Sequence, residues 1–166
     1  MKGVGSLLLY LDFDGVLHHE NVLWHPGRGA YLAAPEGFKI FQHVALLDEL
    51  LSPYPNVRIV LSTSWVLHYG CTKSARYLSP ALQARVVGAT YHSRMSKQEF
   101  RDMPRGEQVW SDALRRKPRD WLALDDQDEN WPHQCRDKLV RTHDQLGLSH
   151  PPVIVEIKRR LKELCA

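Results

Sequence analysis

The chain has 166 residues, a length that favours one domain over two. Hydrophobic residues make up 43% and charged residues 25%, values that are ordinary for a globular protein and that exclude disordered and fibrous classes. The formal net charge of +3 is compatible with an anionic ligand but is too small to indicate one by itself. We therefore expect residues 1–166 to form one domain whose function rests on local motifs.

The cysteines Cys71, Cys135 and Cys165 are odd in number and widely separated in the sequence. This pattern argues against a disulfide scaffold and against a cysteine-type zinc site, and it suits a reducing cytoplasm. No stretch approaches the ~20 apolar residues that a membrane-spanning helix needs. The expected setting is therefore cytoplasmic, with no membrane partner.

Short apolar runs alternate with amphipathic segments along the chain. In chain order, the runs that predict strands are Leu7–Leu11, Val57–Leu61, Val86–Val87, Trp121–Leu124 and Leu139–Val140. Helical spacing of apolar residues predicts helices over Glu36–Leu51, Gly106–Lys117 and Pro151–Leu164. Alternating strands and helices predict an α/β fold, a Rossmann-like three-layer sandwich with a central parallel sheet covered by helices on both faces.

Polar residues follow three of these apolar runs at the point where each run ends. They are Asp12-Phe13-Asp14-Gly15 after the first, Ser62-Thr63-Ser64 after the second and Asp125-Asp126 after the fourth. Because ligands of parallel sheets bind at the carboxyl ends of the strands, we expect these residues to meet at one site. Each segment alone is also common as a turn or a helix cap. Together they predict a metal-assisted phosphoryl site, since crowded carboxylates need a cation and Mg²⁺ prefers oxygen ligands.

These segments also resemble motifs of the haloacid dehalogenase (HAD) superfamily. Leu9–Leu17 resembles its first motif, Ile59–Ser62 its second and Leu122–Asp126 its fourth. More narrowly, Val60–Trp65 and Arg105-Gly106-Glu107 are similar to HAD-like domains associated with bacterial RNA-repair proteins. The resemblance implies a HAD-like fold over nearly the whole chain.

The resemblance further implies a Mg²⁺-dependent phosphohydrolase that cleaves phosphomonoesters through an aspartyl-phosphate intermediate. Asp12 would attack phosphorus, and Asp14 would serve as general acid in the first step and general base in the second. Ser62 and Thr63 would bind the phosphoryl group. Family members that break carbon–halogen bonds lack an acid/base at the position of Asp14, so its presence points to phosphatase or phosphomutase chemistry.

The resemblance places the metal among acidic groups. Mg²⁺ would be held by the carboxylate of Asp12, by the backbone carbonyl of Asp14, and by Asp125, alone or together with Asp126. Which of Asp125 and Asp126 touches the metal directly stays open.

No lysine stands clearly where the family's third motif carries one. Arg105, at the start of a predicted helix, is the preferred substitute, followed by Lys97 and then Arg94. An arginine supplies the charge, but its planar fork differs from the point charge of a lysine. The sequence therefore leaves the cation that steadies nucleophile and phosphate undecided among these residues.

The segments that carry cap domains in other family members are short here. Residues 16–35 suffice for a flap, and residues 65–104 suffice for a short helix, a strand and connections. We therefore expect no large cap domain. An open site suits a large substrate, which can itself exclude water.

Several other side chains near the motifs carry weaker signals. In the flap, Trp24 and Arg28 are suited to stack on a base and to meet a phosphate, although such residues more often pack the loop or face solvent. We expect His18 and His19 on the flap surface rather than on the metal, because Mg²⁺ prefers oxygen. The basic stretch Arg115–Arg119 is expected to be a solvated helix end. The tryptophans expected to pack in the core or at its rim are Trp65, Trp110, Trp121 and Trp131.

Three functions follow from these observations. The first is a metal-dependent phosphatase with a phosphorylated substrate. The second applies the same chemistry to the phosphorylated end of a nucleic acid. The third is a catalytically weak binding module that keeps the fold, for which the missing lysine is the main support. The sequence does not indicate an oligomeric state.

Overall fold

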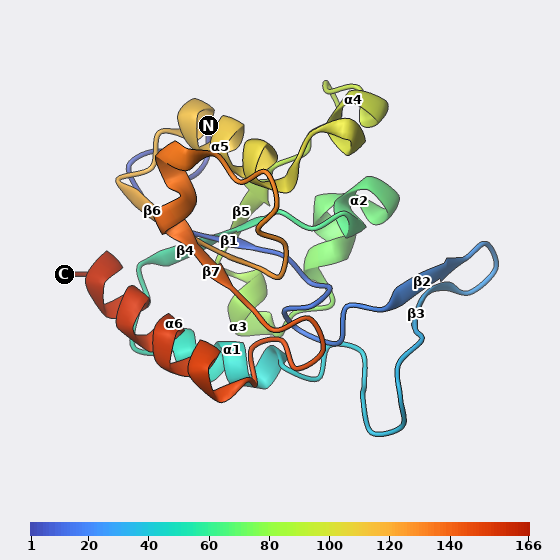
Figure 1. Cartoon of the computed structure of the whole chain (residues 1–166). Helices are drawn as coiled ribbons and strands as arrows, with labels where there is room; N and C mark the ends of the chain where they lie inside the picture. Colours follow the sequence, from blue (N-terminus) through green and yellow to red (C-terminus); the bar gives the residue numbers. More distant parts are fainter.

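A five-stranded parallel sheet forms the centre of the computed structural model, which describes residues 1–166 (Figure 1). Its strands are β1 (Leu7–Leu11), β4 (Val57–Leu61), β5 (Val86–Ala89), β6 (Asp120–Asp125) and β7 (Leu139–Arg141). They lie in the order β5-β4-β1-β6-β7, so β1 is central, with β4 on one side and β6 on the other. All five predicted strands are present, and the predicted bounds of β1 and β4 are confirmed.

Helices cover both faces of this sheet, because successive side chains of each strand point to opposite sides. Leu7, Leu9 and Leu11 belong to the cluster that includes buried residues of α1 (Val44–Leu51) and α6 (Pro151–Leu164). Leu8 and Tyr10 belong to the cluster packed under α5 (Arg105–Arg116) and the 3-10 helix η1 (His133–Lys138). Figure 1 shows α1 and α6 on one side of the sheet and α5 on the other. The predicted α/β three-layer sandwich is confirmed.

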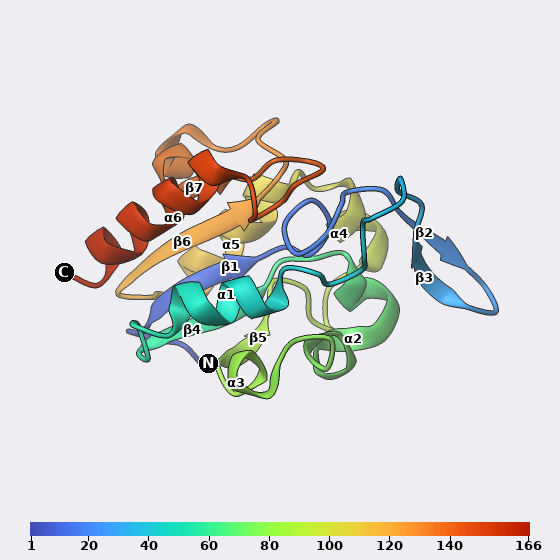
Figure 2. The same ribbon diagram turned by 90° about the horizontal axis from the view of Figure 1, so that it is seen from below.

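No large cap domain covers the sheet. The expected flap is an antiparallel hairpin of β2 (Val22–His25) and β3 (Gly29–Leu32), which projects beyond the sheet in both views (Figures 1 and 2). The segment between β4 and α5 contains α2 (Trp65–Ala75), α3 (Pro80–Gln83), β5 and α4 (Lys97–Asp102). None of the helices combines the length and the apolar character that crossing a bilayer requires.

The helix predicted over Glu36–Leu51 was too long, since α1 begins only at Val44. Gly37 has φ of 97° and Phe41 has φ of 55°, and neither value is compatible with a right-handed helix. The apolar spacing of residues 36–43 therefore reflects packing of a turn segment against the core rather than a helical face.

The prediction of a solvated basic helix end was also wrong in part. Arg116 is buried, and its guanidinium donates to both carboxylate oxygens of Asp112. Asp112 also accepts a hydrogen bond of 2.8 Å from the hydroxyl of Tyr10. A buried carboxylate needs such partners, and Arg116 supplies them from the next turn of the same helix. Trp65, Trp121 and Trp131 are buried, as expected.

Candidate active site

The carboxyl ends of β1, β4 and β6 bring the predicted site residues together. The sheet ladder continues just past the strands, because the N–H of Asp12 donates to Leu124 O at 3.1 Å and that of Ser62 donates to Leu11 O at 2.9 Å. On the far side of β6, the N–H of Thr142 donates to Asp125 O at 2.9 Å. These bonds hold Asp12, Ser62 and Asp125 side by side on one edge of the sheet.

Arg105, the first residue of α5, is the cation beside the predicted nucleophile. Its Nη2 lies 3.5 Å from Asp12 Oδ2, and its Nε lies 3.7 Å from Asp125 Oδ2. Lys97 and Arg94, the alternatives from the sequence, are exposed and form no ion pair. The geometry therefore favours Arg105 for the place of the missing lysine.

Three buried polar atoms at this edge have no hydrogen-bond partner. They are Ser62 Oγ, Arg105 Nη1 and Asp125 Oδ2. A buried polar group without a partner is costly, so such atoms indicate a ligand that supplies the missing contacts. A hydroxyl and a guanidinium N–H suit anionic oxygens, and a carboxylate oxygen suits a cation. The edge thus offers complementary groups for a phosphate and for a metal ion.

The acidic groups at this edge fit a divalent cation. Ligand oxygens of Asp12, Asp125 and Asp126 lie within 4.8 Å of one another, and all three residues are buried. Asp125 Oδ1 already accepts the N–H of Gln127 at 3.0 Å, whereas Oδ2 has no hydrogen bond and only the longer ion pair with Arg105. Burial raises the pKa of Asp12, although Arg105 opposes this shift. Burial and repulsion from Asp12 raise the pKa of Asp125 well above its ordinary value. A cation would relieve this repulsion.

The raised pKa of Asp126 predicts how the stability of the metal-free protein changes with pH. Burial, followed by the charge of Asp12, raises the pKa of Asp126 from 3.8 to about 7. A carboxyl whose pKa is raised in the folded state stabilises the fold fully below pH 3.8, and this contribution is lost as the pH rises through about 7. We therefore expect the melting temperature of the metal-free protein, in EDTA, to fall between about pH 4 and about pH 7. Added Mg²⁺ should stabilise the protein more at the higher pH.

The control for this prediction is a pair of neutralising variants. Asp126→Asn should make the dependence of the melting temperature on pH shallower, with Asp12 and Asp125 accounting for what remains, whereas Asp137→Asn, at an exposed position on η1, should leave it unchanged. An equally steep dependence in Asp126→Asn would show that another group causes it.

Asp14 differs from Asp12, Asp125 and Asp126 because its side chain is 25% exposed, whereas those three residues are buried. Its Oδ1 accepts a hydrogen bond from Trp65 Nε1 at 2.8 Å and lies 2.9 Å from His18 Nε2. The expectation that His18 and His19 lie on the flap surface was wrong, since both are buried. The sequence did not predict the contacts of Trp65 and His18 with Asp14. Its one indication concerns His18 alone, which follows Asp14 by four residues.

The remaining predicted side chain, Thr63, is buried beside Asp12. Its Oγ1 accepts the N–H of Trp65 at 3.3 Å, just before α2 begins. A hydrogen bond from the Thr63 side chain also opposes the rise in the pKa of Asp12. The Thr63 side chain thus has two hydrogen-bond partners within the protein, whereas the hydroxyl of Ser62 has no hydrogen-bond partner.

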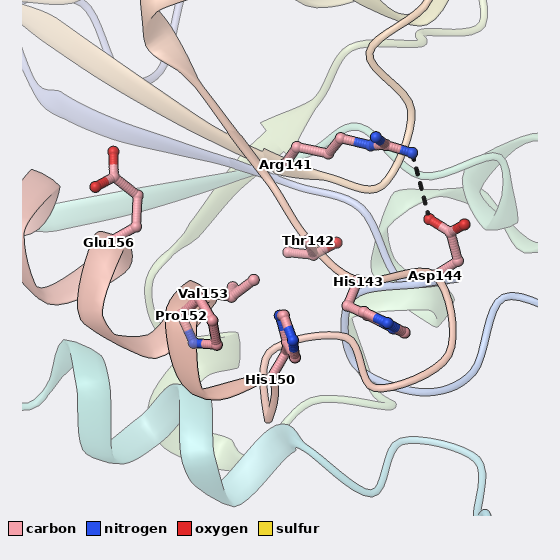
Figure 3. A pocket seen from close by; sticks show the side chains of 8 residues that line it. All are labelled: Arg141, Thr142, His143, Asp144, His150, Pro152, Val153 and Glu156. Carbon is pink, nitrogen blue, oxygen red and sulfur yellow. Dashed lines mark ion pairs between the residues drawn. The ribbon is translucent and has the colours of Figure 1, made fainter.

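Two hollows flank this edge. One, of about 420 Å³, is lined by Arg105, Ser64 and Gln127 and continues along α4, so it opens directly beside the candidate site. The other, of about 410 Å³, lies between β7 and the start of α6 (Figure 3). Figure 3 shows Arg141 pointing toward Asp144 there. None of the three buried atoms without a hydrogen-bond partner belongs to a residue that lines this second hollow.

The second hollow nevertheless borders the turn that follows Asp14. Thr142, one of its lining residues, donates from Oγ1 to Gly15 O at 2.6 Å. Gly15 has φ of 69°, and a Cβ there would collide with the carboxyl group of Asp126. Thr142 and Asp126 therefore hold the turn after Asp14 from two sides, and only glycine fits between them.

Comparison with known proteins agrees with this geometry. A family model described as the HAD domain in Swiss Army Knife RNA repair proteins matches residues 8–153. No curated protein and no solved structure matches the chain. The matched range spans most of the chain and contains all three strand ends described above, together with Arg105. The chain therefore belongs to the family of HAD domains found in Swiss Army Knife RNA repair proteins.

Proposed function

We propose that this protein is a Mg²⁺-dependent phosphomonoesterase that acts through an aspartyl-phosphate on Asp12. The observation that carries the proposal is the set of three buried atoms without partners, Ser62 Oγ, Arg105 Nη1 and Asp125 Oδ2. These two donors and one acceptor lie at the same edge of the sheet as Asp12, and they are the groups that binding of a phosphoryl group and a cation requires. Membership in a HAD family supports a phosphatase-type hydrolase.

The reaction would proceed in two steps. In the first, a carboxylate oxygen of Asp12 bonds to phosphorus as the bond to the leaving oxygen breaks, and Asp14 gives its proton to that oxygen. In the second, water attacks the phosphorus of the aspartyl-phosphate and gives its proton to Asp14. Inorganic phosphate leaves, and the carboxylate of Asp12 is restored.

The other residues would bind and orient the phosphoryl group. Ser62 Oγ and Arg105 Nη1 would donate to its oxygens, and Arg105 would hold Asp12 in line through their 3.5 Å ion pair. Bound Mg²⁺, held by the carboxylates of Asp12 and Asp125 and by the Asp14 carbonyl, with Asp126 alongside, would shield the charge of nucleophile and phosphate. The catalytic contribution of these residues is mainly electrostatic positioning.

The test is hydrolysis of p-nitrophenyl phosphate with Mg²⁺ and with EDTA, in the natural protein and in Asp12→Asn. Turnover that needs Mg²⁺ and is lost in the variant is the expected result. Turnover that is equal in EDTA would contradict the role of the metal.

We propose further that the substrate is the phosphorylated end of a nucleic acid. The family is described as part of RNA repair proteins, and the open edge has no cap domain to enclose a small ester. Beside the site, the exposed ring of His68 stacks on Trp24 at 3.8 Å with an interplanar angle of 12°. Partial burial of the ring, followed by the charges of Arg101 and Lys97, lowers the pKa of His68, which favours the neutral ring. Two cations therefore lie near this aromatic face. This combination suits a base and its neighbouring phosphates.

The substrate proposal predicts selective effects on oligonucleotides. His68→Ala should raise KM for a phosphorylated RNA oligonucleotide about 10-fold, because stacking on an aromatic face contributes ~1–3 kcal/mol per base. The same change should leave p-nitrophenyl phosphate kinetics unaltered. Lys97→Ala should weaken the dependence of KM on salt, whereas Lys158→Ala, at an exposed position on α6, should not. Equal KM effects on both substrates would contradict the proposal.

A further inference from the structure

One carboxylate oxygen of the proposed acid/base takes part in two hydrogen bonds, and the other takes part in none. Asp14 Oδ1 accepts from Trp65 Nε1 at 2.8 Å and faces His18 Nε2 at 2.9 Å. No hydrogen bond or ion pair to Asp14 Oδ2 exists within the protein. An indole N–H only donates, so the Trp65 contact has a fixed direction.

The direction of the His18 contact is fixed by the backbone. The N–H of Phe41, which can only donate, points to His18 Nδ1 at 3.1 Å. Nδ1 therefore carries no proton, and the ring proton sits on Nε2, from which it is donated to Asp14. Phe41 adopts φ of 55°, a left-handed conformation that is unfavourable for a bulky residue. Strain of this kind persists where the surroundings enforce it, and it is concentrated at functional sites.

Both donors are immobilised. His18 and Trp65 are 0% exposed. The ring of Phe41 packs edge-on against both, at 4.7 Å from His18 and 5.0 Å from Trp65. The last torsion of an aspartate side chain is soft, so its two oxygens exchange places easily unless neighbours distinguish them. Here two fixed N–H groups on one oxygen make that distinction.

We infer that Trp65 and His18 are positioning residues for the proton-transfer step of the proposed function, on which this inference rests. They hold Oδ1 of Asp14 within the protein and leave Oδ2 turned to the substrate. Because Oδ1 already faces two N–H groups, the proton given to the leaving oxygen is carried on Oδ2. As the bond from phosphorus to the leaving oxygen breaks, this proton moves to that oxygen, and water returns a proton to Oδ2 in the second step.

The experiment compares two substrates that differ in their need for an acid. A simple alkyl phosphate has a poor leaving group that must be protonated, whereas p-nitrophenolate leaves without a proton. Trp65→Phe and His18→Met remove one donor each and put an apolar side chain in the place of the ring. Each should lower the rate at which the first turnover releases the alcohol of the alkyl phosphate on the order of 10-fold to 100-fold, and the first-turnover release of p-nitrophenolate less than about 3-fold. First-turnover rates are compared because the second step, which also uses Asp14, is common to both substrates. His18→Gln, which keeps an N–H near the position of Nε2, should restore most of the loss.

A matched control removes another buried indole N–H. Trp131 is 3% exposed and donates from Nε1 to Cys135 O at 3.1 Å, without any contact with Asp14. Trp131→Phe should therefore change both substrates equally, whatever it does to the melting temperature. A separate readout is nitrogen NMR of labelled histidine, in which His18 should show the tautomer with the proton on Nε2.

The outcomes separate this inference from the function on which it rests. Equal losses on both substrates in the Trp65 and His18 variants, or a proton on Nδ1 of His18, would overturn the positioning role while the phosphatase stands. If Trp65→Phe does not fold, the His18 variants and the NMR measurement still decide. A natural protein that hydrolyses neither of these substrates nor a phosphorylated RNA oligonucleotide in Mg²⁺ would refute the proposed phosphatase and this inference together.

Discussion

Asp12→Asn is expected to lower kcat for p-nitrophenyl phosphate by on the order of 10³-fold or more, because an amide cannot replace a carboxylate as the attacking group. The same change should leave the metal-free fold intact and at least as stable. Asp12 is buried with Asp125 and Asp126, and their ligand oxygens lie within 4.8 Å of one another. Removing one negative charge from this group relieves repulsion that otherwise raises the pKa of Asp125.

The measurement combines kinetics with thermal unfolding in EDTA. Lost turnover together with an unchanged or higher melting temperature supports Asp12 as the nucleophile. Full activity in the variant would refute that role. No turnover in the natural protein, on either p-nitrophenyl phosphate or phosphorylated oligonucleotides, would favour the third function, a binding module that keeps the fold without the chemistry.

Arg105→Met is expected to affect both activity and stability. Burial by itself disfavours a charged guanidinium, yet Asp12 and Asp125 hold the pKa of Arg105 above its ordinary value. Removing this cation leaves two buried carboxylates without their partner, which costs about 3 kcal/mol or more of unfolding free energy. It also removes the Nη1 donor proposed to bind the phosphoryl group, so kcat/KM should fall by on the order of 10²-fold to 10³-fold. Arg105→Lys should lie between the natural protein and Arg105→Met in both respects.

The chain offers a matched control for this arginine. Arg159 on α6 also pairs with two carboxylates, Glu156 and Glu163, but its side chain is 52% exposed. Water screens such a surface pair, so Arg159→Met should change stability and activity little. A similar loss of stability in both variants would show that burial does not explain the effect. Unfolding in urea with and without Mg²⁺ gives the comparison, and Mg²⁺ should restore part of the stability of Arg105→Met without restoring its activity.

These predictions depend on features that the sequence determined by itself. The bounds of β1 and β4 follow from short apolar runs that lie between polar residues, a local pattern that needs no distant partner. The meeting of Asp12, Ser62 and Asp125 follows from the order of strands and helices, since carboxyl ends of parallel strands share one edge. The absence of a large cap follows from segment lengths alone.

Other features depend on contacts between residues distant in the chain. The sequence ranks Arg105 before Lys97 and Arg94 but does not decide among them, and only the packing of α5 brings Arg105 to Asp12 while Lys97 stays exposed. The apolar spacing of residues 36–43 resembles a helix, but a left-handed Phe41 interrupts it and directs its N–H to His18. The sequence predicts that Trp65 packs in the core, and only the fold shows that its buried ring also donates a hydrogen bond to Asp14.

The physical reason for this division is the range of the forces involved. Hydrophobic periodicity and turn chemistry act over neighbouring residues, so they fix the strands and place polar groups at strand ends. The choice among the candidate cations, and the partners of His18 and Trp65, are decided by desolvation and hydrogen bonding between residues far apart in sequence. The sequence therefore determined where the chemistry of this protein lies, and the tertiary structure decided which side chains hold the reacting groups in place.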